Sequence, residues 1–174
     1  MSSKKINIIL FGIEETGSAL ITEILSNQEP LLENSNLELR LPVITNSTVA
    51  FFEKPTVKNS WEANFIQFAV PFRVEDINNF VQENELENRI AVDTSNTEDI
   101  FPDYFDLLQN DFDIISANPK VGVFSADFKM ALNNSIKKTE KDFVFVNPNE
   151  KNLSGKLLEQ ILRIAAKQNF QIAV

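Results

Sequence analysis

Two glycines five residues apart follow the first apolar run of the chain. The stretch "INIILFGIEETGSALITEIL" covers residues 6–25 and places Gly12 and Gly17 between an apolar run and a helical pattern. In a dinucleotide-binding corner of this kind, one glycine permits the tight turn, a second admits the pyrophosphate, and a third lets the helix pack on the strand. Glu14 stands where the second glycine would be. The corner therefore keeps the turn and packing glycines and lacks the glycine that approaches phosphate.

Glu14 and Glu15 add two negative charges to the first turn of the expected helix. A helix N-terminus carries roughly half a positive charge and favours an anion. Two carboxylates supply that negative charge from within the chain, and a phosphate would meet like charges at about 1 kcal/mol per contact in a wet site. We predict weakened pyrophosphate binding. The alternative is that Gly12 and Gly17 only shape a strand-turn-helix corner.

The composition removes several kinds of catalytic chemistry. The 174 residues include no cysteine and no histidine. Disulfides, thiolate nucleophiles, Cys/His zinc sites and imidazole acid–base catalysis are excluded. Five acids could offer oxygen ligands to a hard cation, but their spacing fits no known loop and is typical of a helix N-terminus. We predict no metal site; the five acids are Asp93, Glu98, Asp99, Asp103 and Asp106.

The charge and the terminal sequence indicate where the protein works. The net charge is −9 and the sequence pI is about 4.6, so phosphate backbones repel the chain and nucleic-acid binding is not expected. The start "MSSKKINIIL" has too short an apolar core for a signal peptide, and no apolar stretch approaches membrane-spanning length. We predict a cytoplasmic protein without a membrane partner.

Apolar strand-like runs alternate with amphipathic patterns along the whole chain. This alternation predicts βαβ crossovers and one α/β domain over residues 1–174, in which helices cover both faces of a parallel sheet. Pro30 is expected to end the first helix, Pro42 to mark a bulge or an edge, and residues 50–70 are hard to assign. The expected strands are 6–11, 37–45, 89–93, 111–116, 142–146 and the terminal "FQIAV", 170–174.

Three segments in order resemble one family. They are "INIILFGIEETGSALITEIL" (6–25), "LPVITNSTVAFF" (41–52) and "IAVDTSNTEDIFPDYFDLLQNDFDIISANPKVGV" (90–123). Together they resemble the nucleotide-binding domain of homoserine dehydrogenase, most closely the dehydrogenase half of the bifunctional aspartokinase–homoserine dehydrogenases. The resemblance covers nearly the whole chain. It implies a Rossmann-like, doubly wound, three-layer fold that would bind NAD(P) at the carboxyl ends of its strands.

The resemblance also implies which residues would hold the cofactor. Residues of the first turn would face the pyrophosphate, and the end of the second strand would lie near the adenosine ribose. Thr94 and Ser95 would lie beside the nicotinamide half, and Asn118 would match the family's asparagine. In chain order these residues are Gly12, Thr16, Gly17, Thr45, Asn46, Ser47, Thr94, Ser95, Asn118 and Lys120.

The chain departs from the family at points that bear on catalysis. In the family a lysine follows the asparagine; here Pro119 follows Asn118, and Lys120 comes one place late. Residues 147–156 replace a glycine-rich "VGAGLP"-like turn. The family's catalytic Asp and Lys come from a further domain, and this chain stops at Val174, about where that domain would begin. We therefore predict no catalytic residue in this chain.

Two functional hypotheses follow. The first is a non-catalytic, homoserine dehydrogenase-like module that acts through protein contacts, as a homodimer or as a regulator of a full-length homoserine dehydrogenase. The second is an oxidoreductase-type NAD(P)-binding domain of amino-acid biosynthesis that keeps weak cofactor affinity. Catalysis by this chain alone as a homoserine dehydrogenase is the least favoured reading. Apolar residues on more than one face of helix 154–168 indicate either a dimer contact or deeper burial against the sheet.

Overall fold

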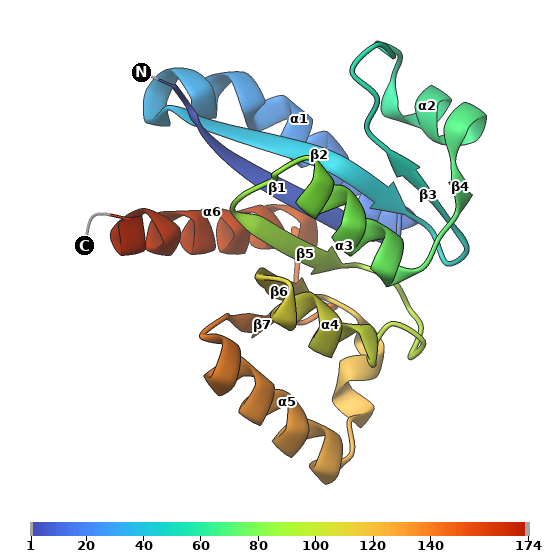
Figure 1. Cartoon of the computed structure of the whole chain (residues 1–174), viewed down its shortest axis with the longest axis vertical. Coiled ribbons are helices and arrows are strands. Elements are labelled where there is room, and N and C mark those ends of the chain that lie inside the picture. Colours follow the sequence, from blue (N-terminus) through green and yellow to red (C-terminus); the bar gives the residue numbers. More distant parts are fainter. Residues whose placement is uncertain (1, 173–174) are drawn as a thin grey trace.

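A seven-stranded sheet forms the centre of the molecule (Figure 1). The computed structural model describes residues 2–172, and it does not describe the side chains of residues 168–172. The strand order is β4-β3-β2-β1-β5-β6-β7. The strands β1, β2, β5, β6 and β7 are parallel to one another, β3 is antiparallel to β2, and β4 is antiparallel to β3. The strands are β1 Lys4–Phe11, β2 Leu37–Thr45, β3 Val49–Phe52, β4 Val70–Pro71, β5 Arg89–Asp93, β6 Phe112–Ser116 and β7 Phe143–Phe145.

Helices cover both faces of this sheet (Figure 1). On one face lie α1 (Glu15–Ser35), α2 (Trp61–Phe68) and α6 (Leu153–Ile172). On the other lie α3 (Val74–Glu83), α4 (Asp103–Gln109) and α5 (Ala126–Thr139), with the short 3-10 helix η1 (Pro119–Val123) before α5. The expected three-layer, Rossmann-like α/β domain is confirmed.

Burial explains why the central strand β1 is mostly apolar from Ile6 to Phe11, with Asn7 as the exception. Ile6, Ile8 and Leu10 belong to the core beneath α1 and α6. Ile9 and Phe11 belong to the core beneath α3, α4 and α5. Because both faces of the strand are buried, no position in this run alternates to solvent.

The chain changes direction across the sheet at β1 and β5. From β1 it moves outward through β2, β3 and β4, and α3 then returns it to β5, which pairs with the other side of β1. The crossover helices after β1 and β5 therefore leave toward opposite faces. In sheets of this kind the space at the carboxyl ends of two such strands forms a binding crevice.

Pro42 lies at a bulge, as expected. The pairing of β1 with β2 shifts between Asn7 and Ile9, whose partners are Arg40 and Val43. The carbonyl of Pro42 accepts a hydrogen bond of 2.7 Å from the amide of Glu53. The bulge accommodates a residue that has no amide hydrogen for the ladder.

Pro30 does not end the first helix, contrary to expectation. It lies inside α1, which continues to Ser35 and is capped by Asn36 in the left-handed conformation. An interior proline removes one backbone hydrogen bond and costs about 3 kcal/mol. Buried residues of α1 such as Ile21 and Ile24, together with Leu31 beyond the proline, pack on the core. This burial holds both halves of the helix against the sheet.

The structure also assigns the segment 50–70 and overturns one further expectation. The segment holds most of β3, the helix α2 and the start of β4, and the N-cap Ser60 of α2 accepts a hydrogen bond from the amide of Ala63. The expected strand at 170–174 is helical over residues 170–172, as the end of α6, and residues 173 and 174 lie outside the described residues. The strands β3 and β4 add an antiparallel edge to the predicted parallel sheet.

Trp61 and the apolar residues of α6 pack on the α1 side of the sheet. Trp61 begins α2 and packs, partly buried, against the core on the α1 side. The apolar residues of α6 are largely buried there too, including Leu157, Ile161 and Ile164. This favours deeper burial for the helix. Among the described residues no helix is long and apolar enough to cross a membrane.

Candidate functional site

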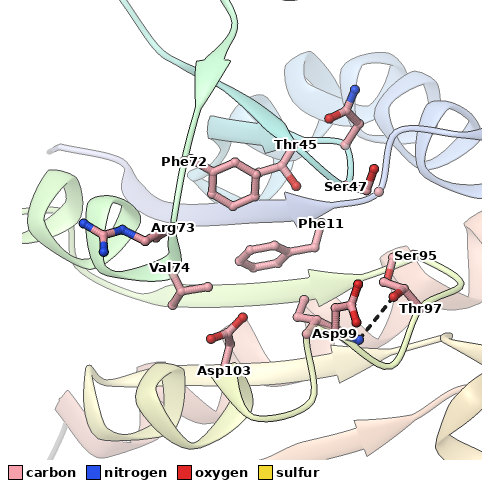
Figure 2. Close-up of a pocket in the computed structure, with 13 residues that line it drawn as sticks. Phe11, Thr45, Ser47, Phe72, Arg73, Val74, Ser95, Thr97, Asp99 and Asp103 are labelled. Atoms are coloured by element: carbon pink, nitrogen blue, oxygen red, sulfur yellow. Dashed lines mark hydrogen bonds between the residues drawn. The ribbon is translucent and has the colours of Figure 1, made fainter.

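A cleft of about 330 Å³ opens at the carboxyl ends of β1 and β2 (Figure 2). Its other walls are the segment before α3 and the loop between β5 and α4. Five of the residues predicted to hold a cofactor line it. They are Gly12, Thr45, Asn46, Ser47 and Ser95.

Neither glycine of the first turn has room for a side chain. Gly12 has φ +98°, and a Cβ there would lie 2.7 Å from the amide nitrogen of Ser95. A Cβ on Gly17 would lie 1.8 Å from the carbonyl oxygen of Gly12. The turn and packing roles assigned to these glycines therefore have a direct structural basis, which holds whether or not a ligand binds.

Glu14 is the N-cap residue of α1, and its side chain is exposed and makes no capping hydrogen bond. Glu15 follows in the first turn, also exposed. We expected these carboxylates to satisfy the helix dipole internally. Glu14 makes no hydrogen bond to the helix start, so it acts on the dipole only through its charge. Thr16 is half-buried and does not line the cleft.

The end of β2 supplies one buried and one exposed hydroxyl to the cleft. Thr45 is 1% exposed, and its carbonyl accepts a 2.9 Å hydrogen bond from the amide of Gly12. Ser47 is exposed. The side-chain oxygen of Asn46 accepts hydrogen bonds from the amides of Thr48 (2.9 Å) and Val49 (2.8 Å), which shape the turn into β3.

The hydroxyls that follow β5 are engaged within the protein. Thr94 donates through Oγ1 to the carbonyl of Gly12 at 2.6 Å. Ser95 donates through Oγ to Asp93 Oδ1 at 2.6 Å. Thr94 thereby ties the β5 loop to the turn after β1, and it lies behind the cleft wall. Neither hydroxyl has its hydrogen available for a ligand in this arrangement.

Asn118, predicted to reach the cofactor, is fully buried. Its Nδ2 donates to Asp93 Oδ2 at 3.0 Å and to the carbonyl of Thr97 at 2.8 Å. Its Oδ1 accepts from the amide of Lys120 at 3.0 Å. The side chain joins the loops after β5 and β6 and has no remaining hydrogen for a ligand. Lys120 itself is exposed in η1 and does not line the cleft.

Asp93 is the centre of this buried network, and the sequence analysis missed that role. Its carboxylate is 1% exposed and also accepts a 2.5 Å hydrogen bond from the hydroxyl of Tyr104, which lies 3.0 Å from Ser116 Oγ. Burial, followed by the charge of Asp93, raises the pKa of Tyr104. A signal was present: Asp93 and Ser116 are polar residues that end adjacent parallel strands and pair in register.

The cleft carries an excess of negative charge. Asp99 and Asp103 line it, and Arg73 is the cation on its wall. Burial, followed by the neighbouring charge of Asp106, raises the pKa of Asp103. Within residues 2–167, whose side chains are described, no three acids gather as a metal site would require.

Sequence comparison finds a relative among bifunctional enzymes. The chain is 25% identical over 145 residues to the bifunctional aspartokinase/homoserine dehydrogenase of Buchnera aphidicola subsp. Acyrthosiphon pisum, a match that covers 83% of this chain and 18% of the relative. The chain resembles part of a homoserine dehydrogenase. The resemblance inferred from the three segments is thus confirmed. No protein-family model matches the chain.

Solved homoserine dehydrogenases share the fold. The enzyme of S. aureus has a TM-score of 0.60 and 21% identity, over 83% of this chain and 33% of its own. That of Thermoplasma acidophilum has a TM-score of 0.62 and 15% identity, over 82% and 43%. A hyperthermophilic archaeal homoserine dehydrogenase in complex with NADPH has a TM-score of 0.58 and 20% identity, over 81% and 43%. The chain therefore spans less than half the length of each of these relatives.

Proposed function

We propose that this chain is a homoserine dehydrogenase-like Rossmann domain that has lost dinucleotide binding in the micromolar range, transfers no hydride itself and acts through association with another protein. The position of Glu14 is the observation that supports the loss of dinucleotide affinity. An exposed carboxylate occupies the N-cap of α1, where a pyrophosphate would have to approach. Asp99 and Asp103 add like charge along the cleft. The residues present therefore fit a dinucleotide poorly.

The buried network supports the absence of hydride transfer. Hydride transfer needs cofactor and substrate held at close reach with a proton donor or acceptor in place. Thr94 and Ser95, which the resemblance places beside the nicotinamide, and Asn118, which it assigns to the cofactor site, direct their hydrogens to Gly12, Asp93 and Thr97. None of them presents a proton to the cleft.

Exposed leucines on α1 support the association. Leu25 is 47% exposed and Leu32 is 45% exposed. They are seven residues apart, so they lie on the same side of the helix. A second copy of this chain, or a full-length homoserine dehydrogenase, could cover them.

The alternative function is weak NAD(P) binding by an oxidoreductase-type domain. A cleft at the carboxyl ends of the strands and the retained glycines favour it. One structural neighbour is a complex with NADPH.

Calorimetric titration with NADPH tests the first part, with a full-length homoserine dehydrogenase as the positive control. We expect no measurable heat from this chain at concentrations that saturate the control. A micromolar dissociation constant would contradict the proposal and support the alternative.

Sedimentation velocity tests the association. We expect the chain to sediment as a dimer or together with a full-length homoserine dehydrogenase, and Leu25→Glu with Leu32→Glu to weaken that complex. Because both side chains are exposed, the double variant should keep the fold, which circular dichroism checks. A chain that stays monomeric and leaves the enzyme's activity unchanged would overturn this part.

A further inference from the structure

The cleft combines two aromatic side chains with a carboxylate on the facing wall. Phe11 comes from the end of β1, and Phe72 precedes α3. Asp103 begins α4 on the facing wall. Figure 2 shows the Asp103 carboxylate directed from α4 toward the side that carries Phe11 and Val74.

Among the described residues, the Asp103 carboxylate has no counter-ion. It is half-buried, and no described residue offers it a hydrogen bond or an ion pair. Asp106, three residues later on α4, adds a charge of the same sign. Partial burial of an unpaired charge is unfavourable, so a cation that reached Asp103 would be stabilised.

Arg73 does not supply that cation. Its guanidinium forms no ion pair with the described residues, and Figure 2 shows it turned away from the Phe11 ring. Asp99 places a second carboxylate on the same wall as Asp103. The net charge of −9 extends the negative field beyond the cleft and draws cations toward it.

We propose that this cleft binds a small organic ammonium ion, with the cationic group against Asp103 and the apolar part between Phe11 and Phe72. The inference rests on the proposed function, because it requires the dinucleotide to leave the cleft free. The cleft volume of about 330 Å³ lies at the lower end for ligand pockets, which suits a molecule of this size. Phenylalanine faces also attract cations.

A matched pair of probes tests the charge. Phenethylammonium and 2-phenylethanol have nearly the same shape and differ in the charged group. In calorimetry at neutral pH we expect the ammonium ion to bind about tenfold more tightly, as expected for one charged contact in a partly desolvated cleft. Equal affinities, or no binding of the ammonium ion, would overturn the proposal.

Two variants locate the contact. Asp103→Asn keeps the shape of the side chain, and we expect it to reduce ammonium affinity about tenfold, to that of the alcohol. Asp127→Asn removes an exposed acid from the first turn of α5, away from the cleft, and should leave the affinity unchanged. Thermal unfolding confirms that both variants fold. A loss that is equal in both variants, or absent from Asp103→Asn, would contradict the assignment.

NADPH in the same assay separates this inference from the proposed function. Micromolar NADPH binding would refute the proposed function. Failure of the ammonium ion alone, with NADPH still unbound, would refute only the cation site. Binding of the ammonium ion that is lost in Asp103→Asn would support it.

Discussion

At the scale of single residues, the two departures near the cleft act through different physics. Glu14 is exposed and acts through its charge at the start of α1. Asn118 is buried, and its hydrogen-bonding capacity is used inside the protein. A substitution at Glu14 can therefore change ligand affinity without harming the fold, whereas one at Asn118 would disturb the fold first.

Glu14→Gly should raise the affinity for NADPH. It removes one like charge, at about 1 kcal/mol in a wet site, and restores close approach of the backbone, so we expect a gain of about 5- to 10-fold. The cost to the helix is a few tenths of a kcal/mol, because glycine is tolerated at an N-cap. Glu14→Gln keeps the bulk and should show only the part due to charge. Fluorescence titration with NADPH checks both, and unchanged affinity in both would contradict the role of Glu14.

Tyr104 predicts how stability depends on alkaline pH. Its folded-state pKa is raised by burial and by the charge of Asp93, so the folded protein keeps the phenol proton above pH ~10, where the unfolded chain releases it. The stabilisation is present below pH ~10 and is lost as pH rises above it, at about 1.4 kcal/mol per pH unit.

One tyrosine in the chain makes this measurement specific. The ultraviolet absorbance of tyrosinate should appear together with unfolding in an alkaline titration. Tyr104→Phe should lose about 1–2 kcal/mol at neutral pH, because it removes the hydrogen bond to Asp93, and should lack this alkaline loss. A tyrosinate signal near pH 10 from a protein that circular dichroism shows to be folded would refute the prediction.

The sequence predicts single residues unevenly, for a physical reason. Glu14 can be interpreted from sequence because its position in a short motif fixes its place at the helix start. The role of Asn118 cannot, because Asp93 and Thr97, to which its side chain donates, are 25 and 21 residues away and meet it only when β5 and β6 pair. The same residue types in the same order suit a ligand contact and a buried hydrogen-bond network equally well. Geometry decides between them.

At the scale of elements, Gly17 controls how α1 packs on the turn after β1. Gly17→Ala would place its Cβ 1.8 Å from the Gly12 carbonyl oxygen, so backbone must move, and we expect a loss of about 2–4 kcal/mol. Gly122→Ala is the control, because its Cβ would meet nothing within 4 Å; its effect should stay within about 0.5 kcal/mol. Urea denaturation compares them.

Equal losses in the two glycine variants would show that the corner is not tightly packed. The comparison also decides whether a Gly17 variant can be used to locate a bound ligand. Because its substitution affects the fold, lost cofactor affinity in a Gly17 variant would not by itself locate a ligand. Glu14 is the better position for that purpose.

Elements were predictable where local pattern and burial agree. The central strands follow from apolar runs, and the start of α5 agrees with capping chemistry, since Ser125 accepts from the amide of Phe128 at 3.1 Å. The Pro30 expectation failed because tertiary burial competes with local preference. At Pro30 the core contacts of α1 outweigh one lost hydrogen bond. In residues 61–68 the Ser60 cap begins a helix whose sequence also suits a strand.

At the scale of the whole molecule, net charge and cleft charge have the same sign. The alternation of strands and helices predicted the architecture, because each βαβ crossover must pack on one sheet. The net charge of −9 adds a long-range field to the carboxylates at the cleft, and salt screens that field within about 10 Å at 0.1 M. Anionic and cationic ligands should therefore respond to salt in opposite directions.

Raising the salt concentration from about 0.05 M to about 0.5 M should strengthen NADPH binding about 2- to 3-fold and weaken phenethylammonium binding by a similar factor. Screening relieves the repulsion of the phosphates and reduces the attraction of the ammonium group. Glu14→Gln should flatten the first dependence, and Asp103→Asn the second, because each removes a nearby charge. Fluorescence titration with NADPH and calorimetry with phenethylammonium, each at several salt concentrations, measure the two dependences. Salt effects of the same sign for the two ligands would mean that specific ion binding, and not the field of the protein, controls access to the cleft.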